Sequence, residues 1–356
     1  MIPKKISEKI LTVGCAFQDP KGGIAQLLHN YQSFIFEDMK YVGNSDSGTV
    51  IHKLEVFVKG IIRFFYILLF DRKIKIVHIH TASRTDFRRS ILYARFAFLF
   101  RKRVVLTVHG GMFKEYASKH QNYIARWLRR CDSIIALSDS WKFYFETQFK
   151  CSNVEVVPNV VMDPQISGDI QNMRSEKPLT FLFLGALVEQ KGIYDLLEVM
   201  SSSSNEWRGK IHLIIAGRGE DERVRSFIYN HSLKNMVDFV GWADEASKRN
   251  LLRISSVFIL PSYIEGLPIS ILEAMTYRMP IISTNVGGIP EVVNATNGIL
   301  FRPGDKKGLK EAIDVLCNDS DLRKCLGRRS WEKVHPYLPS AVESKLMEVY
   351  GNLLED

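Results

Sequence analysis

The sequence predicts an α/β protein made of two Rossmann-like domains with parallel sheets, and three observations support this. The chain has 356 residues, which exceeds one compact core and suits two domains of ordinary size. Hydrophobic residues make up 46% of the sequence, enough for a full core in each domain. Short apolar runs rich in β-branched residues alternate with longer amphipathic stretches, which is the pattern of repeated strand–helix–strand units.

Predicted strands and helices alternate along both halves of the chain. In the first half, we expect strands at 9–14, 75–80, 103–110, 133–138 and 154–159, with helices that include 22–34, 85–100 and 119–130. In the second half, we expect strands at 179–185, 211–217, 237–241, 257–262 and 280–285, with helices at 192–200, 220–231, 245–254 and 268–278.

A polar break that contains proline and glycine, residues 162–178, divides the two halves. We therefore assign residues 1–165 to an N-terminal domain and 166–339 to a C-terminal domain. The amphipathic tail 340–356 follows the breaker 335–339, and we expect it to return to the first domain as a helix. Ligands of open α/β sheets bind at the carboxyl ends of the strands, so functional residues are expected in the loops after the strands.

Cysteine usage and hydropathy restrict the class of protein. The five cysteines are odd in number and form no CxxC pair, which argues against a disulfide framework or a zinc site. The N-terminus lacks the apolar core of a signal peptide. The longest apolar stretch, 55–70, is interrupted by Lys59 and Arg63 and falls short of the ~20 apolar residues of a spanning helix. We expect a cytoplasmic protein that is not integral to a membrane.

Positive charge is concentrated in the first half of the chain. Residues 1–165 contain 25 lysines and arginines against 14 acidic residues, a net charge of +11, whereas residues 166–356 contain 23 against 25. This asymmetry indicates an anionic partner for the first half. The residues predicted to face an acceptor or an anionic membrane are His80, Arg84, Arg88 and Arg89. The alternative is an ordinary solvated charged face.

Two glutamates eight residues apart flank a predicted helix start in the second domain. Glu265 lies in the loop after the strand 257–262, and Glu273 lies five residues into the following helix, about 7.5 Å further along its axis. Pro268 suits the first turn of this helix, and Gly266 allows a ligand to approach the backbone. The free amides bind anions and the carboxylates bind hydroxyls, which matches a nucleotide sugar. The alternative is a helix-terminal glutamate plus a solvated one.

Three other loops of the second domain follow strands and offer similar chemistry. Gly287 and Gly288 precede Pro290 in a second strand-to-helix turn. Lys191 stands just before a helix, where an ammonium group can neutralise a diphosphate. The loop 217–220 carries a Gly-x-Gly turn, which is weak evidence alone. Ordinary turn glycines and a surface lysine are the alternatives.

The first domain contributes two comparable loops. Gly22 and Gly23 occupy a strand-to-helix turn, and His109 ends a strand beside two glycines. A structural role for the histidine is the alternative. Asp319 and Asp321 form an Asp-x-Asp sequence that we interpret as a helix cap, so we predict a site that requires no metal and no other cofactor.

Together, these loops resemble glycosyltransferase family 4, whose members are retaining, nucleotide-sugar-dependent enzymes with the GT-B fold. That fold has two Rossmann-like domains facing a central cleft, with a C-terminal helix that crosses back to the first domain. The resemblance in the second domain is carried by an E-x7-E signature in 261–275 and by 287–291, 237–242 and 191–192. A weaker resemblance extends to Gly22–Gly23, 107–111 and 156–159.

The resemblance implies roles for individual residues. Glu273 would bind the donor ribose, Glu265 would face the donor sugar, and Lys191 would bind the diphosphate. His109 would contact the sugar from the other domain, so the implied catalytic residues are His109, Glu265 and Lys191. The implied donor-binding set is Gly22, Gly23, Lys191, Gly217, Arg218, Gly241, Glu265, Gly266, Leu267, Pro268 and Glu273. Family members usually have an arginine where this chain has Ala186, and Arg218 or another cation would have to compensate.

The implied reaction moves a hexosyl group from a UDP- or GDP-sugar to an acceptor hydroxyl with retention of configuration. The implied acceptor is a lipid-linked or free saccharide in O-antigen, capsule or exopolysaccharide synthesis, at the inner face of the cytoplasmic membrane. A GT-B epimerase, a phosphorylase and a non-catalytic nucleotide-sugar-binding protein remain alternatives. Nucleic-acid binding is disfavoured, because the sequence contains no recognised nucleic-acid-binding module.

Overall fold

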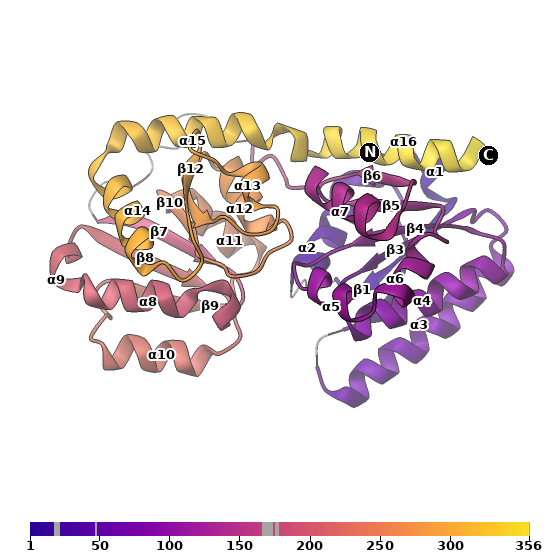
Figure 1. Cartoon of the computed structure of the whole chain (residues 1–356), viewed down its shortest axis with the longest axis horizontal. Helices are drawn as coiled ribbons and strands as arrows, with labels where there is room; N and C mark the ends of the chain where they lie inside the picture. Colours follow the sequence, from indigo (N-terminus) through magenta and orange to yellow (C-terminus); the bar gives the residue numbers. More distant parts are fainter. Residues whose placement is uncertain (18–21, 47, 166–173, 175–177, 356) are drawn as a thin grey trace. The chain divides into compact units, whose positions relative to one another are not determined.

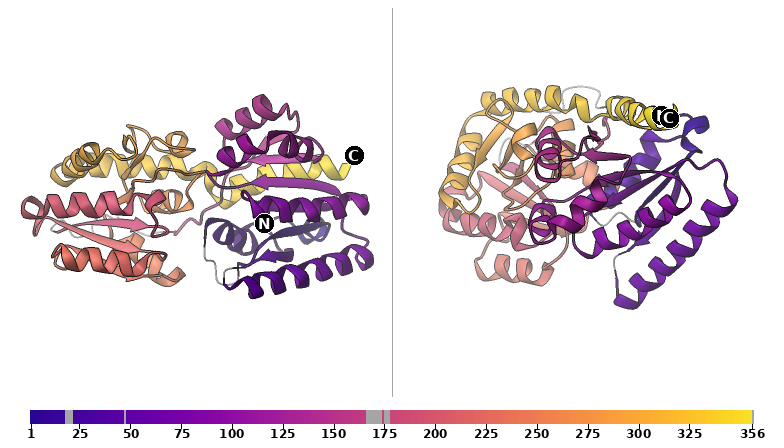
Figure 2. Two further views of the ribbon diagram at one scale, coloured as in Figure 1. Left: turned by 60° about the horizontal axis from the view of Figure 1, so that its bottom comes forward. Right: turned by 45° about the vertical axis from the view of Figure 1, so that its right-hand side comes forward.

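The computed structural model describes residues 1–17, 22–46, 48–165, 174 and 178–355 (Figure 1). The chain divides into two compact units: residues 1–162 with 336–356, and residues 163–335. Each unit contains its own six-stranded sheet, with helices on both faces (Figures 1 and 2). Most of the predicted break 162–178 lies outside the described residues.

The first sheet has the strand order β2-β1-β3-β4-β5-β6, and its neighbouring strands are all parallel. The strands are β1 (Ile10–Cys15), β2 (Lys40–Ser45), β3 (Ile76–Thr81), β4 (Arg103–Val108), β5 (Ser133–Ala136) and β6 (Val154–Val156). The helices are α1 (Lys4–Ser7), α2 (Gly23–Asn30), the π-helical turn η1 (Tyr31–Ile35), α3 (Val50–Phe70), α4 (Thr85–Leu99), α5 (Phe113–Lys119), α6 (Gln121–Leu128), α7 (Asp139–Phe149) and α16 (Pro339–Glu355). Every residue of β3 and β5 is buried, as expected for parallel strands covered on both faces.

The second sheet has the strand order β12-β11-β10-β7-β8-β9 and is also parallel. Its strands are β7 (Leu179–Leu184), β8 (Ile211–Ala216), β9 (Val237–Gly241), β10 (Val257–Leu260), β11 (Ile281–Thr284) and β12 (Gly298–Phe301). Its helices are η3 (Glu189–Lys191), α8 (Ile193–Ser202), α9 (Ser204–Trp207), α10 (Asp221–Asn230), α11 (Glu245–Ile254), α12 (Ile269–Thr276), α13 (Ile289–Val292), α14 (Lys306–Asn318) and α15 (Ser320–Val334), followed by the 3-10 turn η4 (His335–Tyr337). The predicted α/β fold class is therefore confirmed.

Two strands, β2 and β12, are absent from the sequence-based prediction. Both lie at an edge of their sheet, where one side of the strand has no neighbouring strand to bury it. Strand β2 has the sequence KYVGNS and only half of its residues are buried. Strand β12 has four residues, of which three are half-buried. Neither edge strand therefore needs the long apolar run by which the central strands were predicted.

The strand order reverses once in each sheet. In the first sheet the reversal lies between β1 and β3, and in the second it lies between β7 and β10. At such a point the connections from the two neighbouring strands leave in opposite directions and open a crevice at their carboxyl ends. The loops after β1, β3, β7 and β10 are therefore the positions where each unit can hold a ligand.

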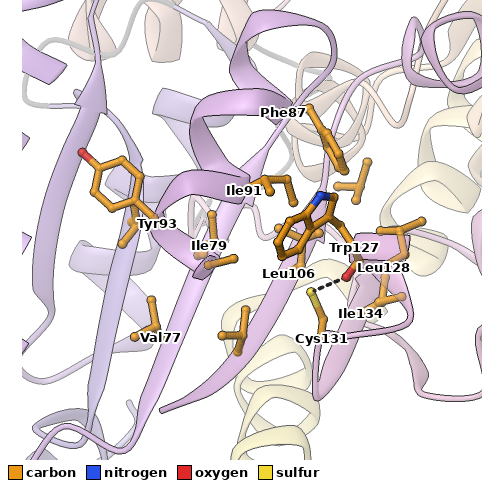
Figure 3. Packing of buried hydrophobic residues seen from close by; sticks show 14 of the residues in the cluster. Val77, Ile79, Phe87, Ile91, Tyr93, Leu106, Trp127, Leu128, Cys131 and Ile134 are labelled. Atoms are coloured by element: carbon orange, nitrogen blue, oxygen red, sulfur yellow. Dashed lines mark hydrogen bonds between the residues drawn. The ribbon is translucent and has the colours of Figure 1, made fainter. Parts of the chain in front are cut away.

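The core of the first unit is packed between the sheet and its helices (Figure 3). Ile79 and Leu106 of the sheet pack with Phe87 of α4 and Trp127 of α6 in one buried cluster. Cys131 belongs to the same cluster as a free thiol, and its Sγ donates to the Trp127 carbonyl at 3.3 Å. Burial raises the pKa of the Cys131 thiol, so this cysteine acts as a packing residue.

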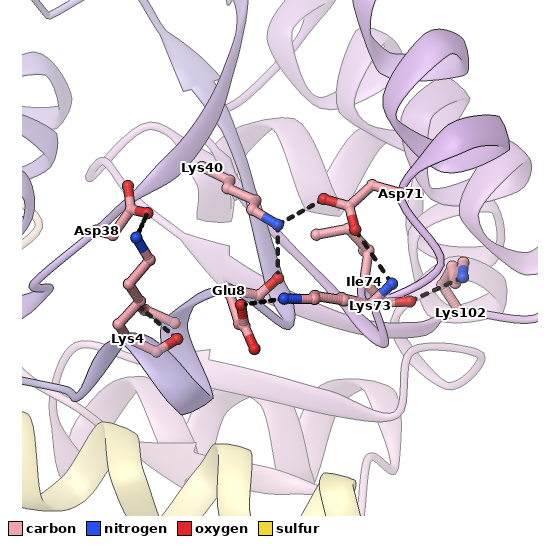
Figure 4. Close-up of polar contacts among 9 residues, drawn as sticks. Lys4, Glu8, Asp38, Lys40, Asp71, Lys73, Ile74 and Lys102 are labelled. Carbon is pink, nitrogen blue, oxygen red and sulfur yellow. Dashed lines mark hydrogen bonds and ion pairs between the residues drawn. The ribbon is translucent and has the colours of Figure 1, made fainter.

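Ion pairs gather before the first residues of β1, β3 and β4, at the amino edge of the first sheet (Figure 4). Lys40 Nζ donates to the Glu8 carbonyl at 2.9 Å and to Asp71 Oδ2 at 2.5 Å. Lys73 Nζ donates to Glu8 Oε2 at 2.8 Å, and Lys102 donates to a backbone carbonyl nearby. These cations join neighbouring loops at the amino edge of the sheet. The opposite, carboxyl edge is the one at which ligands are expected.

The C-terminal helix α16 belongs to the first unit, which agrees with the predicted return of the tail. Tyr350 of α16 is fully buried, and its hydroxyl lies 2.7 Å from His78 Nδ1 of β3. The Met1 amino group lies 2.9 Å from Glu343 of the same helix. Helix α16 therefore makes a buried polar contact with the sheet and a second polar contact with the N-terminal amino group.

Helix α3 has 21 residues and approaches β2 closely at Gly60. A Cβ atom at Gly60 would lie 2.2 Å from the Gly43 carbonyl oxygen and 2.7 Å from the Tyr93 hydroxyl. The packing of α3 against the sheet therefore requires glycine at this position. Among the described residues, no helix is both long and apolar enough to span a membrane.

Replacing Gly60 by alanine is expected to destabilise the first unit. Alanine normally stabilises a helix by about 0.5–1 kcal/mol relative to glycine. At Gly60 the added methyl group forces α3 away from β2, which costs about 1–3 kcal/mol. Gly351→Ala is the matched control, because a Cβ at this helical glycine of α16 meets no atom within 4 Å.

Thermal unfolding of the two alanine variants measures the difference. We expect Gly60→Ala to lower the unfolding midpoint and Gly351→Ala to leave it unchanged or raise it. An equal shift in both variants would show that α3 can move from β2 without cost.

Candidate functional site

The loops after β7 and β10 meet where the second sheet reverses its strand order. Lys191, at the end of η3, donates from Nζ to Glu265 Oε1 at 2.6 Å. Ser262 Oγ donates to the same oxygen, also at 2.6 Å. Glu265 is only 8% exposed, and a buried carboxylate requires such donors. The structure thus brings together Lys191 and Glu265, two of the three predicted catalytic residues.

A glycine makes the contact between these two loops possible. Gly192 has φ +69°, and a Cβ atom there would lie 2.0 Å from the Pro261 carbonyl oxygen. The Tyr263 amide donates to the Gln190 carbonyl at 2.8 Å in the same contact. Any larger residue at Gly192 would separate the loops and withdraw Lys191 from Glu265.

The two predicted helix starts of this unit also touch. Gly287 has φ +56°, and a Cβ there would lie 2.0 Å from the Glu265 carbonyl oxygen. The Gly288 amide donates to the Gly266 carbonyl at 2.6 Å. Pro268 is the N-cap of α12, and Leu267 beside it is buried. The first turn of α12 has backbone N–H groups without intrahelical acceptors, and they lie at the same edge as Lys191.

Glu273 lies on α12 and is held by a lysine that the sequence analysis missed. Lys248 Nζ of α11 donates to Glu273 Oε1 at 2.6 Å and lies 2.9 Å from Glu245 Oε2. Burial raises the pKa of Glu273, although Lys248 acts in the opposite direction. Burial alone would lower the pKa of Lys248, but Glu273 and Glu245 together raise it. Lys248 therefore stays charged, and it fixes the Glu273 carboxyl group.

Nothing in the local sequence marks Lys248 as a site residue. It is one of several charged residues on α11, and its partner Glu273 lies 25 residues further along the chain. Its burial, with only 8% of its surface exposed, is apparent in the structure alone.

The loops after β8 and β9 form the other side of the crevice. The Gly217 amide donates to the Gly241 carbonyl at 2.8 Å, which joins the two loops. The Arg218 guanidinium carbon lies 5.3 Å from the ring centroid of Trp242. The guanidinium group of Arg218 thus stacks on an aromatic ring, and its compensation for Ala186 stays a prediction.

The predicted glycines of the first unit begin α2. Gly22 is the N-cap of α2 and Gly23 is its first residue, while residues 18–21 before them lie outside the described part of the chain. A Cβ atom at either glycine would meet nothing within 4 Å. Packing within the protein therefore does not demand glycine here, and the open space suits the approach of a ligand to the backbone.

Three histidines form a buried chain behind the carboxyl edge of β3 and β4. His109 Nε2 lies 3.0 Å from His80 Nδ1, and the two rings stack. His78 lies 2.7 Å from both the Tyr350 hydroxyl and Thr107 Oγ1. Burial lowers the pKa of His109 and of His78 to about 3. His109 is therefore neutral near pH 7.

The prediction that His80 faces an acceptor or a membrane is wrong. His80 is 1% exposed, and its ring is in contact with Tyr31, His78 and His109. The alternating pattern of β3 placed His80 on the same face as His78, but the sequence did not show that helices cover this face. His80 instead supports the ring of His109.

The three predicted basic residues after β3 differ in their environments. Arg89 Nη2 lies 3.2 Å from Asp86 Oδ1, and Asp86 also accepts the Ala82 amide at 2.7 Å, so this arginine stabilises the loop. Arg84 and Arg88 are exposed. The sequence pattern could not distinguish the structural arginine from the two exposed ones.

The Asp-x-Asp sequence is a helix cap, as predicted. Asp319 is the N-cap of α15, and its Oδ1 accepts the Leu322 amide at 2.8 Å. In the described part of the chain, no three His, Cys, Asp or Glu side chains gather as ligands for a metal ion.

Two family models match adjoining parts of the chain. The model for glycosyl transferases group 1 matches residues 169–332, and the model for Glycosyltransferase Family 4 matches residues 48–162. The chain belongs to glycosyltransferase family 4. The match to the group 1 model, residues 169–332, contains every predicted donor-binding residue of the second unit, including the Lys191–Glu265 pair.

Curated relatives of this family 4 chain include an uncharacterized glycosyltransferase of Haemophilus influenzae. It is 27% identical over 230 residues, which cover 62% of this chain and 58% of the relative. The capsular polysaccharide biosynthesis glycosyltransferase CapM of Staphylococcus aureus is 27% identical over 49% of this chain and 46% of its own length. The chain therefore matches about half to three fifths of the length of these relatives.

Solved structures similar to this family 4 chain have the GT-B fold. Sucrose-phosphate synthase of Thermosynechococcus elongatus superposes with a TM-score of 0.78 at 17% identity, over 98% of this chain and 99% of its own. Anabaena HepE, in complex with UDP, superposes with a TM-score of 0.75 at 14% identity, over 97% of this chain and 100% of its own. The fold of the family 4 chain is therefore GT-B.

The buried histidines of this family 4 chain predict a loss of stability in acid. Burial lowers the pKa of His78, His80 and His109 in the folded state, whereas the unfolded chain has an ordinary histidine pKa of about 6.5. Their contribution to stability is present in full above pH ~6.5 and is lost as the pH falls toward ~3, because the unfolded state binds more protons.

Urea unfolding of the wild type and His78→Gln at pH 7 and pH 5 tests this expectation. His78→Gln is less stable at pH 7, because Tyr350 and Thr107 lose a buried partner. As the pH falls from 7 to 5, the free energy of unfolding of His78→Gln should fall less steeply than that of the wild type, by up to about 1.4 kcal/mol per pH unit. Exposed His231→Gln is the control. An unchanged slope in His78→Gln would contradict a buried neutral imidazole at this position.

Proposed function

We propose that this chain transfers a sugar from a nucleoside-diphosphate sugar to an acceptor hydroxyl, with retention of the anomeric configuration. The observation that carries the proposal is the Lys191–Glu265 pair at the reversal point of the second sheet, beside the first turn of α12. Membership of family 4 and the likeness to HepE, which was solved with UDP, support a nucleotide-linked donor.

The positive groups of the crevice suit the diphosphate of such a donor. As the bond between the sugar and the phosphate breaks, negative charge develops on the leaving diphosphate. Lys191 and the free amides at the start of α12 stabilise this charge. Lys191 is already oriented by Glu265, so little reorganisation is needed. Since these protein groups supply the positive charge, the proposal includes no metal ion.

The two glutamates would bind hydroxyl groups on either side of the diphosphate. Glu273 would accept hydrogen bonds from the ribose hydroxyls, with its carboxyl group held in place by Lys248. Glu265 would lie against the donor sugar, where its carboxylate can stabilise positive charge that develops at the anomeric carbon. His109 is neutral and its Nε2 pairs with His80, so its Nδ1 is the ring nitrogen that would form a hydrogen bond with a sugar hydroxyl.

We further propose that the acceptor is a saccharide on a lipid diphosphate, in the synthesis of a surface polysaccharide. The similarity to CapM supports this class of pathway. The concentration of positive charge in residues 1–165 favours an anionic acceptor at the inner face of the cytoplasmic membrane.

Helix α3 offers a surface that suits such a membrane. A stripe along the helix exposes large apolar side chains: Val50, Ile51, Leu54, Val58, Ile62, Tyr66, Leu69 and Phe70 are each between 46% and 82% exposed. The exposed cations Lys53, Lys59 and Arg63 lie on the same helix. An apolar face bordered by cations matches the interface of an anionic bilayer.

Nucleotide binding and turnover test the roles of the two glutamates. A thermal-shift screen of UDP, GDP, ADP and their sugars first identifies the donor, because bound ligand stabilises the native state. With that nucleotide, Glu273→Ala should bind roughly tenfold more weakly by calorimetry, since a charge-assisted hydrogen bond to ribose is lost. Glu265→Gln should reduce turnover far more than nucleotide affinity.

The control for these variants is Glu222→Ala, which removes an exposed glutamate of α10. Unchanged affinity in Glu273→Ala would contradict its ribose role, and equal losses of affinity and turnover in Glu265→Gln would argue against a role in the reaction step. The assays are run with EDTA, so an activity that disappears on its addition would refute the metal-free proposal.

Vesicle flotation tests the α3 surface. The protein should float with vesicles that contain phosphatidylglycerol, and less with pure phosphatidylcholine or in high salt. Leu54→Ser with Ile62→Ser should reduce the bound fraction at least tenfold, because each exposed side chain loses burial in the interface. Val315→Ser, an exposed apolar residue of α14, is the control. Equal flotation of both variants would rule out α3 as the membrane contact.

A further inference from the structure

A hollow of about 340 Å³ lies between the start of α4 and helix α5 in the first unit. Its lining includes Arg84 and Arg88 from the α4 side and Glu115, Tyr116 and Lys119 from α5. Both helices follow neighbouring strands, β3 and β4, so the hollow lies at the carboxyl edge of the first sheet. This is the edge at which parallel sheets bind ligands.

The hollow contains two arginine side chains that form no ion pair with the described residues. Lys119 Nζ lies 2.8 Å from Glu115 Oε1, so these two charges cancel. The Arg88 amide donates to the Arg84 carbonyl at 3.2 Å, but neither guanidinium group forms a hydrogen bond or an ion pair with a residue that the structure describes. Two guanidinium groups are therefore available to an anion.

Tyr116 also lines the hollow, and its hydroxyl group is buried and unused. Tyr116 is 7% exposed, and its hydroxyl group has no hydrogen-bond partner among the described residues. A buried hydroxyl without a partner costs free energy, so it is retained where a ligand supplies the missing acceptor.

The backbone at Arg84 is strained in a way that fixes this residue beside the hollow. Arg84 has φ 58° and ψ −123°, which is the first central position of a type II′ turn and normally takes glycine. The Asp86 amide closes this turn onto the Ser83 carbonyl at 3.2 Å. Strain of this kind is typical of functional loops. Glycine would relieve the strain at this position, but it would not supply a guanidinium group to the hollow.

The hollow lies beside the loop of His109. A Cβ atom at Gly110 would lie 4.0 Å from the Ala82 side chain, so the loops after β3 and β4 touch. A ligand in the hollow is thereby placed next to the loop that carries the proposed sugar-contacting histidine.

We propose that this hollow binds a phosphate group of the acceptor, with Arg84, Arg88 and the Tyr116 hydroxyl as its donors. The proposal rests on the proposed function, since it assigns the acceptor substrate of that reaction. Guanidinium groups bind phosphate oxygens in a bidentate manner, and two guanidinium groups without an ion-pair partner match a phosphate monoester or a diphosphate. The phosphate comes from a lipid diphosphate or from a soluble sugar phosphate, which share this chemistry.

Calorimetry with inorganic pyrophosphate tests the hollow in the full-length protein. The Lys191→Ala variant is the background, because the proposed donor site also binds pyrophosphate. In this background, Arg84→Gln and Arg88→Gln should each weaken binding about tenfold, and Tyr116→Phe should weaken it roughly fivefold. Arg126→Gln, an exposed arginine of α6 outside the hollow, should leave binding unchanged.

Tyr116→Phe also separates binding from folding. Its hydroxyl has no partner in the protein, so the variant should keep or raise the thermal midpoint while it binds pyrophosphate more weakly. Pyrophosphate affinity equal to the background in all three hollow variants overturns the proposal. Failure of the donor site is recognised separately, because Lys191→Ala would then bind pyrophosphate as the wild type does.

The source of the phosphate is determined with two further probes. Farnesyl diphosphate in phosphatidylcholine vesicles represents a lipid source, and glucose 1-phosphate represents a soluble one. The probe whose binding depends more strongly on Arg84 and Arg88 identifies the source, and either result supports the phosphate site. If the arginine variants bind both probes as tightly as the background does, the phosphate site is contradicted.

Discussion

The reversal of strand order between β7 and β10 is the constraint on which the rest of the candidate site depends. It sends the two loops in opposite directions, yet Gly192 lets them touch at Pro261, so Lys191 meets Glu265 across the crevice. Gly287 then fixes the Glu265 loop from the other side. The charged pair is thus set by backbone contacts that only glycine permits, and side-chain packing alone could not hold it.

The first sheet uses the same constraint with different chemistry. Its reversal lies between β1 and β3, and the loops there carry Gly23 and Arg84. Behind this edge, His80 supports His109 and His78 connects β3 to α16 through Tyr350. The buried histidine chain therefore links the proposed sugar-contacting side chain to the helix that completes the first unit. Neutral imidazoles can serve this purpose, because they make these contacts without bringing charge into the core.

The sequence was informative where function depends on local geometry and uninformative where it depends on distant partners. Central strands, the Glu265–Glu273 spacing and the Asp319 cap are local patterns, and each appears where expected. The partner of Lys248 is 25 residues away, and no local pattern reveals it. The exposed stripe of α3 was hidden for another reason. Apolar residues surround this helix, so its periodicity could not show which face packs on β2 and α4 and which one stays exposed.

The cations of the first unit fall into two groups: those that form ion pairs or ring contacts within the protein, and those that stay exposed. Lys40 and Arg103 pair with aspartates, Arg89 holds the Asp86 loop, and Arg130 stacks on Phe98 and Trp127. These cations are used in joining loops and covering rings, so they contribute little attraction for a distant anion. The exposed cations that remain include Lys53 and Arg63 of α3 and Arg84 and Arg88 at the start of α4. These cations share their unit with the apolar stripe of α3 and with the hollow, an arrangement that suits the anionic, membrane-attached acceptor that we propose.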